Sequence, residues 1–357
     1  MKKIKVLVVD DSAFMRKLIS DFLSSEAMIE VVGIARNGQD ALAKLKQLNP
    51  DVITMDVEMP VMNGIDALKQ IMHVRPTPVI MLSSTTTEGA QNTIQAMTYG
   101  AFDFIAKPSG AISLDLHIVK DEIISKVIHA SRSNIKGLLE STKESTISGD
   151  IYSKIELSSK HITWMESSKK ILCIGTSTGG PRALQKVLTG LPGGIDVPIF
   201  VVQHMPPGFT KSLADRLNSL CEITVKEAEH GEVIKNGVAY IAPGGYHLKV
   251  KRIGTSLAIN IEHSEVRNGH RPSVDVLFES ISELQDYVKI AVIMTGMGSD
   301  GSRGLKQLKE SGQVIGIAES ENTSIVFGMP KAAIATNLID NVVPLDTISD
   351  TIMRYLK

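Results

Sequence analysis

The sequence predicts an α/β protein made of two doubly wound parallel-sheet domains, and three observations support this. Short apolar runs alternate with helical patterns along most of the 357 residues. A chain of this length commonly forms two domains of ordinary size. Acidic residues, serines and glycines directly follow several apolar runs, at the position where doubly wound sheets place their binding sites. We therefore expect two separate parallel sheets, each with a site at the carboxyl ends of its strands.

In the first part of the chain, five short apolar runs are rich in β-branched residues, as buried parallel strands are. The expected strands are 5–9, 31–35, 52–55, 79–82 and 102–105. The stretches between them carry apolar residues at helical spacing, and the expected helices are one beginning after Ser12 and those at 41–48, 65–74, 90–99 and 115–131. Ser12 suits a helix start because its hydroxyl can accept a backbone N–H of the first turn. Residues 1–125 are expected to form a flavodoxin-like domain.

The next segment differs in composition. Residues 140–160 are rich in Ser, Thr, Lys and Glu and poor in large apolar side chains. Such a segment buries too little apolar surface to offset the loss of chain entropy, so we expect a linker over 126–168.

A second, Rossmann-like α/β domain is expected over 169–357. Its expected strands are 171–175, 198–202, 290–294 and 314–317, and its expected helices are 182–189, 210–220, 274–284 and 302–311. Residues 232–261 alternate apolar and polar side chains around the pairs Asn236-Gly237 and Gly244-Gly245, which are common turn sequences. We expect this segment to form β-hairpin strands inserted in the parallel scheme.

Bulk composition argues against several classes of protein. The formal net charge is −1, which gives no general electrostatic basis for binding nucleic acid or an anionic membrane. No apolar run approaches the roughly 20 residues of a membrane span, and the first residues lack a signal-peptide cleavage pattern. The two cysteines, Cys173 and Cys221, do not suggest a disulfide framework. We expect a soluble, reduced, cytoplasmic protein with no nucleic-acid partner and no membrane insertion.

The segment 171–180, ILCIGTSTGG, contains the most informative pattern of the second domain. Ser177 lies between Gly175 and Gly179 on a predicted tight turn from a strand to a helix. A serine held at such a turn can attack a carbonyl group, while nearby backbone N–H groups receive the negative charge that develops. The pattern predicts a nucleophilic serine, and a Gly-rich loop that binds a phosphate or a dinucleotide is the alternative.

A serine nucleophile needs a base, usually a histidine that is oriented by a carboxylate. His204 follows strand 198–202, and Asp300 follows strand 290–294 in a glycine-rich segment. Both are therefore expected at the same sheet edge as Ser177, although Asp300 is also a good candidate for a helix N-cap. The order Ser, His, Asp differs from the order in α/β-hydrolases. Four other histidines of this domain are expected at the surface, namely His230, His247, His263 and His270.

The first domain has its own set of polar residues at strand ends. Asp10 and Asp11 follow the first strand, Asp56 the third, Ser83 the fourth and Lys107 the fifth. Three carboxylates at one edge repel each other unless a hard cation such as Mg²⁺ lies among them. With Lys107 and Ser83 available to a phosphoryl group, the set predicts that Asp56 is a nucleophile that forms an aspartyl-phosphate.

Residues 1–125 resemble the receiver domain of two-component response regulators, through LVVDDS, DVITMDVEMPVMNG, PVIMLSS and DFIAKP. The resemblance implies that Asp56 is the phosphoacceptor and that Mg²⁺ is held by Asp11 and Asp56, together with Asp10. Phe104 lies where such domains carry an aromatic switch residue, and an ordinary core phenylalanine is the alternative.

Nearly the whole chain resembles the chemotaxis protein-glutamate methylesterases, through IGTSTGG, VQHMPPGFT, APGGYH, RPSVDVLF, TGMGSDG and GMPKAA. The resemblance implies that Ser177 is the nucleophile, that His204 is the general base and acid, and that Asp300 orients His204. The backbone N–H groups of Thr178 and Met297 are candidates for the oxyanion hole, with loop packing as the alternative for Met297.

The same resemblance implies a reaction and its partners. Glutamyl γ-methyl esters of methyl-accepting chemotaxis receptors would be hydrolysed with release of methanol, and specific receptor glutamines would be deamidated, as part of chemotactic adaptation. A chemotaxis histidine kinase would be the phosphodonor. Mg²⁺ would serve phosphorylation only, and ester hydrolysis would need no cofactor.

Two alternative functions remain at this stage. One is a response regulator that binds a nucleotide through 175–180, although Ser177 replaces the second glycine of the dinucleotide pattern. The other is a DNA-binding regulator, which lacks support because the sequence shows no basic patch and no helix-turn-helix pattern. The hydrolase hypothesis predicts that the first domain covers the Ser177 crevice until phosphorylation of Asp56 shifts the population toward an open arrangement.

Overall fold

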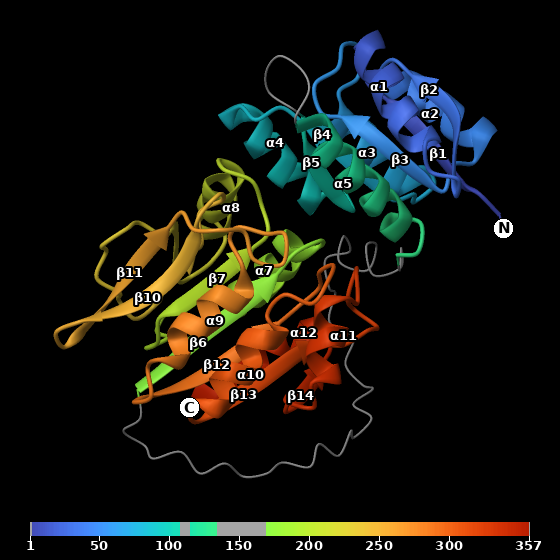
Figure 1. The fold of residues 1–357 in the computed structure, drawn as a ribbon. Helices are drawn as coiled ribbons and strands as arrows, with labels where there is room; N and C mark the ends of the chain where they lie inside the picture. Colours follow the sequence, from blue (N-terminus) through green and yellow to red (C-terminus); the bar gives the residue numbers. More distant parts are fainter. Residues whose placement is uncertain (1, 108–114, 134–168, 357) are drawn as a thin grey trace, which may run out of the picture.

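Two parallel sheets organise the molecule, a five-stranded sheet in the first domain and a seven-stranded sheet in the second (Figure 1). The computed structural model describes residues 2–107, 115–133 and 169–356. The expected linker, 126–168, therefore lies outside the described residues from 134 onward. None of the helices in these three described ranges is long and apolar enough to cross a membrane.

The first sheet has the strand order β2-β1-β3-β4-β5, which confirms the expected doubly wound arrangement. Its strands are β1 Ile4–Val9, β2 Ile29–Ala35, β3 Val52–Asp56, β4 Val79–Ser83 and β5 Asp103–Ala106. The helices are α1 Ala13–Ser24, α2 Gly38–Leu48, α3 Gly64–Val74, α4 Thr87–Thr98 and α5 Asp115–Ala130. Ser12 caps α1 as expected, since its side chain accepts the N–H of Met15. The last helix ends at Ala130, beyond the expected domain boundary at 125.

The second sheet has the order β14-β13-β12-β6-β7-β9-β8, and every neighbouring pair in it is parallel. Its strands are β6 Lys169–Thr176, β7 Ile199–Gln203, β8 Thr224–Glu227, β9 Val238–Ile241, β12 Tyr287–Ile293, β13 Val314–Glu319 and β14 Asn341–Val343. Its helices are α7 Gly180–Thr189, α8 Phe209–Asn218, α9 Val274–Ser282, α10 Ser302–Glu310, α11 Met329–Ala335 and α12 Leu345–Leu356. The central strands β6, β7 and β12 are buried along most of their length because helices cover both faces of the sheet.

The expectation for residues 232–261 needs a correction. A hairpin is present, but it consists of β10 His247–Ile253 and β11 Ser256–Glu262, which form a separate two-stranded sheet. Its turn is at Gly254, whereas Asn236-Gly237 leads into β9, a parallel member of the main sheet. Gly237 and Gly245, in the two predicted turn pairs, both have positive φ, whereas the turn at Gly254 was not predicted. A turn sequence alone does not show whether the next strand is antiparallel or parallel. Strands β8 and β14 and helices α11 and α12 were not among the expected elements.

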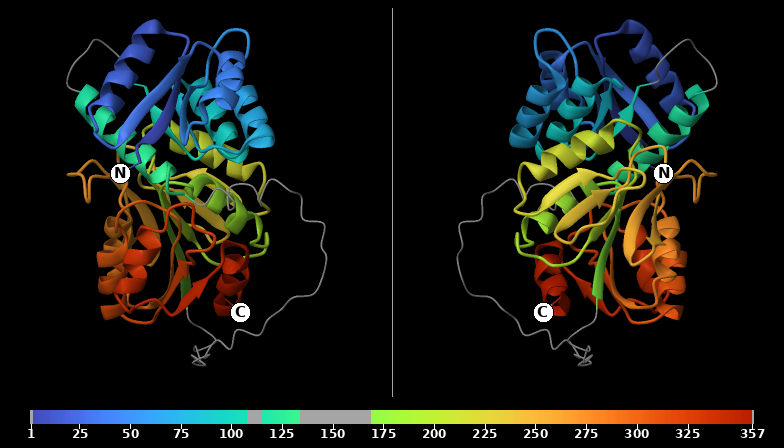
Figure 2. Two further views of the ribbon diagram at one scale, coloured as in Figure 1. Left: turned by 90° about the vertical axis from the view of Figure 1, so that its right-hand side faces the viewer. Right: turned by 90° about the vertical axis from the view of Figure 1, so that its left-hand side faces the viewer.

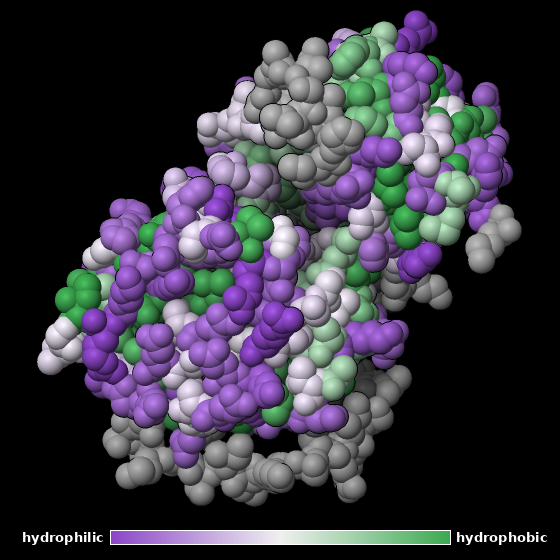
Figure 3. All heavy atoms as spheres, in the orientation of Figure 1, coloured by the Kyte–Doolittle hydropathy of each residue, from purple (hydrophilic) through white to green (hydrophobic). Residues whose placement is uncertain are grey.

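The two domains lie against each other (Figure 2). They are in contact through helices and through a pair of aromatic side chains. Helix α4 of the first domain packs against α7 and α8 of the second. Phe104 at the start of β5 stacks on Phe209 of α8, with ring centroids 4.6 Å apart. Phe104 thus packs across the domain interface. Neither of the two roles considered for it, an aromatic switch residue or an ordinary core phenylalanine, included this contact. Polar side chains cover much of the outer face of the second domain, with apolar ones in small groups (Figure 3).

Candidate active site

Ser177 lies on the short connection between β6 and α7, and it is buried. The Ser177 N–H donates to the Thr295 carbonyl at 3.0 Å, and the Gly180 N–H donates back to the Ser177 carbonyl at 2.8 Å. Gly179 has a φ of 78°, a left-handed conformation that disfavours residues with a Cβ. A Cβ atom added at Gly296 would lie only 2.7 Å from the Cβ of Ser177. The loop that contains Gly296 therefore packs so closely on Ser177 that there is no space for a side chain at this position. This tight turn confirms the local geometry expected from the spacing of the glycines.

His204 follows β7 and lies in the same pocket as Ser177. The preceding residue, Gln203, is buried, and its side-chain amide donates to the carbonyls of Ser177 and His204 at 2.9 and 3.1 Å. One side chain therefore ties the backbone of the serine turn to that of the histidine. The sequence analysis did not identify this role of Gln203, although its place before His204 at a strand end was a usable signal.

Asp300 is buried and accepts a hydrogen bond from His204 Nε2 at 2.8 Å, which brings the two residues together as expected. His204 Nδ1 is also buried, and it has no hydrogen-bond partner in the described part of the chain. With its proton on Nε2 and facing a carboxylate, the imidazole presents an unprotonated Nδ1. That nitrogen is the one available to accept the Ser177 proton.

Asp300 also caps a helix, but not the one that follows it. Its carboxylate accepts the N–H groups of Val274 and Asp275 at 2.7 and 3.2 Å, and the Ser273 hydroxyl at 2.8 Å, all at the start of α9. In return, Asp275 accepts the N–H groups of Gly301 and Gly304 at 2.9 and 2.7 Å, at the start of α10. Helices α9 and α10 thus cap each other through two buried aspartates.

These donors determine the charge state of Asp300. Burial acts to raise its pKa, but the hydrogen bonds from His204, from the Val274 N–H and from Ser273 outweigh burial and hold the pKa well below its usual range. The N-terminus of α9 adds a favourable helix dipole. The carboxylate is therefore ionised at any pH at which the protein works.

The pocket around these residues has a volume of about 560 Å³ and is lined by both domains. Ser177, Thr178, His204 and Met297 line it from the second domain, which places both oxyanion-hole candidates beside the serine. From the first domain, the lining residues are Asp103, Phe104, Ala106, Glu122, Ser125 and Lys126.

One contact joins the first domain to the serine turn directly. The hydroxyl of Thr178 donates to the Asp103 carboxylate at 2.7 Å, and Lys126 forms an ion pair with the same carboxylate at 3.3 Å. Lys126 also donates to the carbonyl of Phe104 and pairs with Glu122 at 2.8 Å. The first domain therefore places a charged network, which runs from the buried Asp103 through Lys126 to the exposed Glu122, next to the predicted nucleophile.

Two histidines lie elsewhere than expected. His247 is buried, and its Nε2 lies 2.9 Å from the carbonyl of Glu265. His270 stacks on His204, with ring centroids 3.9 Å apart and ring planes 15° from parallel. The expectation that these side chains lie at the surface was wrong, because residues 263–271 fold back over the sheet edge instead of extending from the hairpin.

In the first domain, the expected acidic cluster forms at the end of the sheet. Ligand oxygens of Asp10, Asp11 and Asp56 lie within 4.8 Å of one another, and Lys107 Nζ is 3.0 Å from Asp10 and 2.8 Å from Asp56. Burial is the largest influence on Asp56 and raises its pKa to about 6, although Lys107 acts in the opposite direction. Three clustered carboxylates with one exposed member fit Mg²⁺, which prefers hard oxygen ligands and retains several waters.

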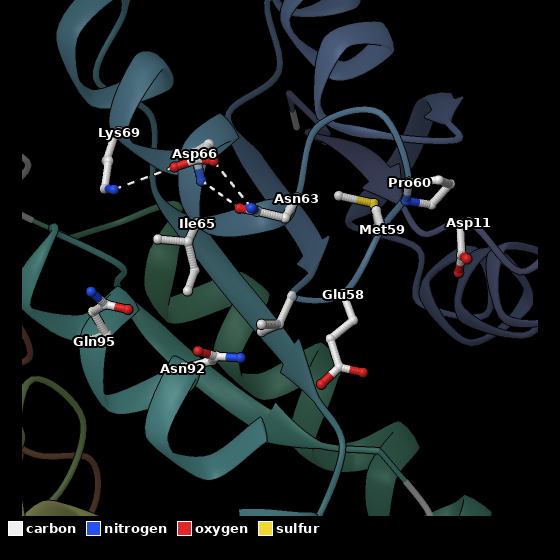
Figure 4. A pocket seen from close by; sticks show the side chains of 11 residues that line it. Asp11, Glu58, Met59, Pro60, Asn63, Ile65, Asp66, Lys69, Asn92 and Gln95 are labelled. Carbon is white, nitrogen blue, oxygen red and sulfur yellow. Dashed lines mark hydrogen bonds and ion pairs between the residues drawn. The ribbon is translucent and has the colours of Figure 1, made fainter. Parts of the chain in front are cut away.

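Ser83 is buried, and its hydroxyl donates to the carbonyls of Ser84 and Gly89 at 3.1 and 3.0 Å. The structure thus does not place this hydroxyl in contact with the carboxylates. A pocket of about 530 Å³ opens beside the cluster, with Asp11 and Glu58 toward one end and Lys69 and Gln95 toward the other (Figure 4).

Comparison with known protein families identifies both domains. Residues 172–352 match the model of the CheB methylesterase family, and residues 6–118 match that of the response regulator receiver domain. A protein-glutamate methylesterase/protein-glutamine glutaminase of Geobacillus kaustophilus is 57% identical over 363 residues, covering 100% of this chain and 99% of the relative. The Bacillus subtilis protein of the same name is 50% identical, covering 99% of both chains.

Among solved structures, the Thermotoga maritima CheB methylesterase catalytic domain is 46% identical, with a TM-score of 0.51, and covers 53% of this chain and 99% of its own. The chain therefore belongs to the CheB methylesterase family and carries a receiver domain before the methylesterase domain. This assignment favours the hydrolase hypothesis over the nucleotide-binding and DNA-binding alternatives.

Proposed function

We propose that this protein is a phosphorylation-activated serine hydrolase of the cytoplasm that demethylates glutamyl γ-methyl esters on methyl-accepting chemotaxis receptors and deamidates specific receptor glutamines. The observation that carries this proposal is the alignment of His204 between Asp300, on its Nε2 side, and the Ser177 pocket. The names of the relatives support the substrate class, since both are protein-glutamate methylesterases and protein-glutamine glutaminases.

In the proposed first step, Ser177 Oγ attacks the ester carbonyl while His204 Nδ1 takes the hydroxyl proton. The bond between the carbonyl carbon and the methoxy oxygen then breaks, and His204 returns the proton to the departing methanol. A water molecule repeats the sequence on the acyl-enzyme and releases the glutamate side chain and Ser177. For a glutamine substrate the leaving group is ammonia, so one site serves both reactions.

Negative charge develops on the carbonyl oxygen during both attacks. The backbone N–H groups of Thr178 and Met297 line the pocket that holds Ser177, so we propose them as the oxyanion hole. Asp300 stabilises the imidazolium form of His204 without taking its proton, because the Asp300 carboxylate already accepts four other hydrogen bonds.

In the receiver domain, we propose Asp56 as the phosphoacceptor and a chemotaxis histidine kinase as the phosphodonor. Mg²⁺ would be held by Asp11 and Asp56, together with Asp10, and would offset the charge of these carboxylates and of the incoming phosphoryl oxygens. Lys107 is placed to pair with the added phosphoryl group, because it already pairs with Asp56. Ser83 would have to turn away from Gly89 to donate to that group.

We propose that the receiver domain limits access to Ser177 until Asp56 is phosphorylated. Support comes from the shared pocket, the Thr178–Asp103 hydrogen bond and the Phe104–Phe209 stack, all of which hold the receiver against the serine turn. Phosphorylation would then shift the population toward an arrangement in which these contacts are broken.

The test measures methanol release from methylated cytoplasmic fragments of chemotaxis receptors. Wild type, Ser177→Ala and Asp56→Asn are compared, each with and without acetyl phosphate and Mg²⁺. We expect stimulated release from wild type, none from Ser177→Ala, and an unstimulated basal rate from Asp56→Asn. Release that persists in Ser177→Ala would contradict the proposed nucleophile, and full stimulation of Asp56→Asn would contradict the proposed gate.

A further inference from the structure

Residues Arg267 to His270 form a tight turn beside the catalytic pair. The N–H of Arg267 donates to the carbonyl of His270 at 3.0 Å, and the N–H of His270 donates back at 2.9 Å. The two residues between them, Asn268 and Gly269, have φ values of 54° and 79°. Two consecutive positive φ values closed by this pair of bonds define a type I′ turn, for which Asn-Gly is the preferred sequence. The backbone of the turn is therefore fixed by its own sequence.

This turn directs two side chains toward different members of the catalytic pair. Asn268 Nδ2 donates to Asp300 Oδ1 at 2.7 Å and to Asp275 Oδ2 at 2.8 Å, so its amide lies between two buried carboxylates. His270 stacks on the ring of His204 at a centroid distance of 3.9 Å. One four-residue turn thus contacts both the carboxylate and the imidazole.

We propose that the turn 267–270 is a positioning clamp for catalysis, in which His270 holds the ring plane of His204 and Asn268 holds the carboxylate of Asp300. The proposal rests on the catalytic roles proposed above for His204 and Asp300. His270 lines the same pocket as Ser177, but in this proposal both clamp residues act through His204 and Asp300, so both are positioning residues.

The geometry explains why such a clamp is needed. A single hydrogen bond from Nε2 to Asp300 leaves the His204 ring free to pivot about the line that joins these atoms. His204 Nδ1 has no hydrogen-bond partner in the described part of the chain, so nothing on that side of the ring opposes a pivot that would change the direction of Nδ1 within the pocket shared with Ser177. A flat ring stacked almost parallel at 3.9 Å removes that freedom. On the other side, Asn268 adds a third donor to Asp300 Oδ1, beside the Ser273 hydroxyl and the Asp275 N–H, and so further limits rotation of the carboxylate.

The electrostatic surroundings keep the stack attractive. Burial lowers the pKa of His270 to about 4, and repulsion from His204 and Lys126 acts in the same direction while Asp300 opposes it. His270 is therefore neutral at neutral pH and can lie against His204 in either protonation state of the latter. The other charged groups that line this pocket are Asp103, Glu122 and Arg271.

The test uses the full-length chain, stimulated with acetyl phosphate and Mg²⁺, and measures methanol release from methylated receptor fragments over a range of pH. The variants are His270→Ala, which removes the ring; His270→Phe, which keeps a flat ring without nitrogens; and Asn268→Gly, which keeps the positive φ but removes the amide. His263→Ala is the matched control, because His263 belongs to the same segment, is exposed, and contacts Tyr246 instead of His204. Thermal melting shows whether each variant is folded.

We expect His270→Ala to lower kcat by roughly ten- to a hundred-fold with KM nearly unchanged, as small displacements of a catalytic group do. This loss should persist over the whole pH range, because it arises from the position of the His204 ring. His270→Phe should stay within about three-fold of wild type, Asn268→Gly should lose roughly ten-fold in kcat, and His263→Ala should match wild type.

Other outcomes would overturn the clamp. His270→Ala and Asn268→Gly with wild-type kcat would show that no positioning is needed, and His270→Phe as impaired as His270→Ala would show that a stacked ring is not what matters. Methanol release that does not depend on Ser177 would instead overturn the proposed function itself, and the clamp with it.

Discussion

Asp56 in the first domain and Asp300 in the second are both buried aspartates at the carboxyl edge of a parallel sheet, yet their environments act in opposite directions. Asp56 lies beside two other carboxylates and one lysine, and its pKa is raised to about 6. Asp300 lies among neutral donors and a histidine at a helix N-terminus, and its pKa is lowered. Two aspartates at the same position in the fold therefore differ in their ionisation: the pKa of Asp56 lies near neutral pH, whereas Asp300 stays ionised. Burial acts to raise the pKa of both carboxyls, and the number and kind of hydrogen-bond donors decide whether that effect prevails, as at Asp56, or is outweighed, as at Asp300.

The largest expected effect comes from removing the negative charge of Asp300. Asp300→Asn should reduce basal and stimulated methanol release by about 10³- to 10⁴-fold, because His204 loses the partner that fixes its tautomer and stabilises its charge. Asp56→Asn, the corresponding change in the first domain, should leave the basal rate intact. A basal rate for Asp300→Asn within ten-fold of wild type would mean that the two aspartates do not differ in this way.

A third buried carboxylate extends the comparison to stability. Glu319 ends β13 and accepts the N–H of Thr295, and burial raises its pKa to about 7 in spite of the opposing effect of Arg182. The folded protein thus holds a proton that the unfolded chain releases near pH 4.5. Between pH 4.5 and about 7 the free energy of unfolding should therefore fall as pH rises, by an amount on the order of 2–3 kcal/mol.

Glu319→Gln should remove most of this slope while keeping the acceptor for Thr295. Urea titrations of wild type and variant at a series of pH values would measure it. If the free energy of unfolding fell with pH equally steeply in wild type and in the variant, Glu319 would not be the group responsible for the fall.

A smaller effect is expected at the domain interface. Asp103→Asn keeps a polar group beside Thr178 but removes the charge that pairs with Lys126, so it should weaken the hold of the receiver on the serine turn. The basal rate of methanol release should rise by about three- to ten-fold, which corresponds to roughly 1 kcal/mol. The rate with acetyl phosphate should not change, and an unaltered basal rate would indicate that this contact does not restrain the receiver.

The smallest effect should come from an exposed pair that belongs to neither site. Lys17 and Asp21 lie one turn apart on α1, 2.7 Å from each other, with most of both side chains in solvent. Lys17→Ala should change the free energy of unfolding by no more than about 0.5 kcal/mol, measured by urea denaturation. A loss of more than about 1 kcal/mol would show that exposure is a poor guide to the contribution of a charge in this protein.

Much of this organisation could be predicted from the sequence because parallel strands bring their ends to one edge. Asp10, Asp56 and Lys107 follow different strands, and their convergence needed only the strand order. The pairing of His204 with Asp300 followed in the same way.

The clamp could not be predicted, although Asn268-Gly269 is a strong turn signal. Such a signal fixes the local backbone but not what the flanking side chains face after the chain folds back. The same limit explains the misplaced hairpin, since β8 and β9, the strands on either side of Asn236-Gly237, pair in parallel and not as a hairpin.

Because α9 and α10 cap each other, the structure links the loss of activity on heating, and its return on cooling, to these two helices. With one carboxylate, Asp300 binds His204, the proposed catalytic base, and caps the start of α9, and Asp275 completes the exchange at α10. Any partial unfolding that detaches either helix also releases His204 from its partner. Loss of activity on warming should therefore coincide with the melting of these helices, and activity should return on cooling only when both helices have docked again.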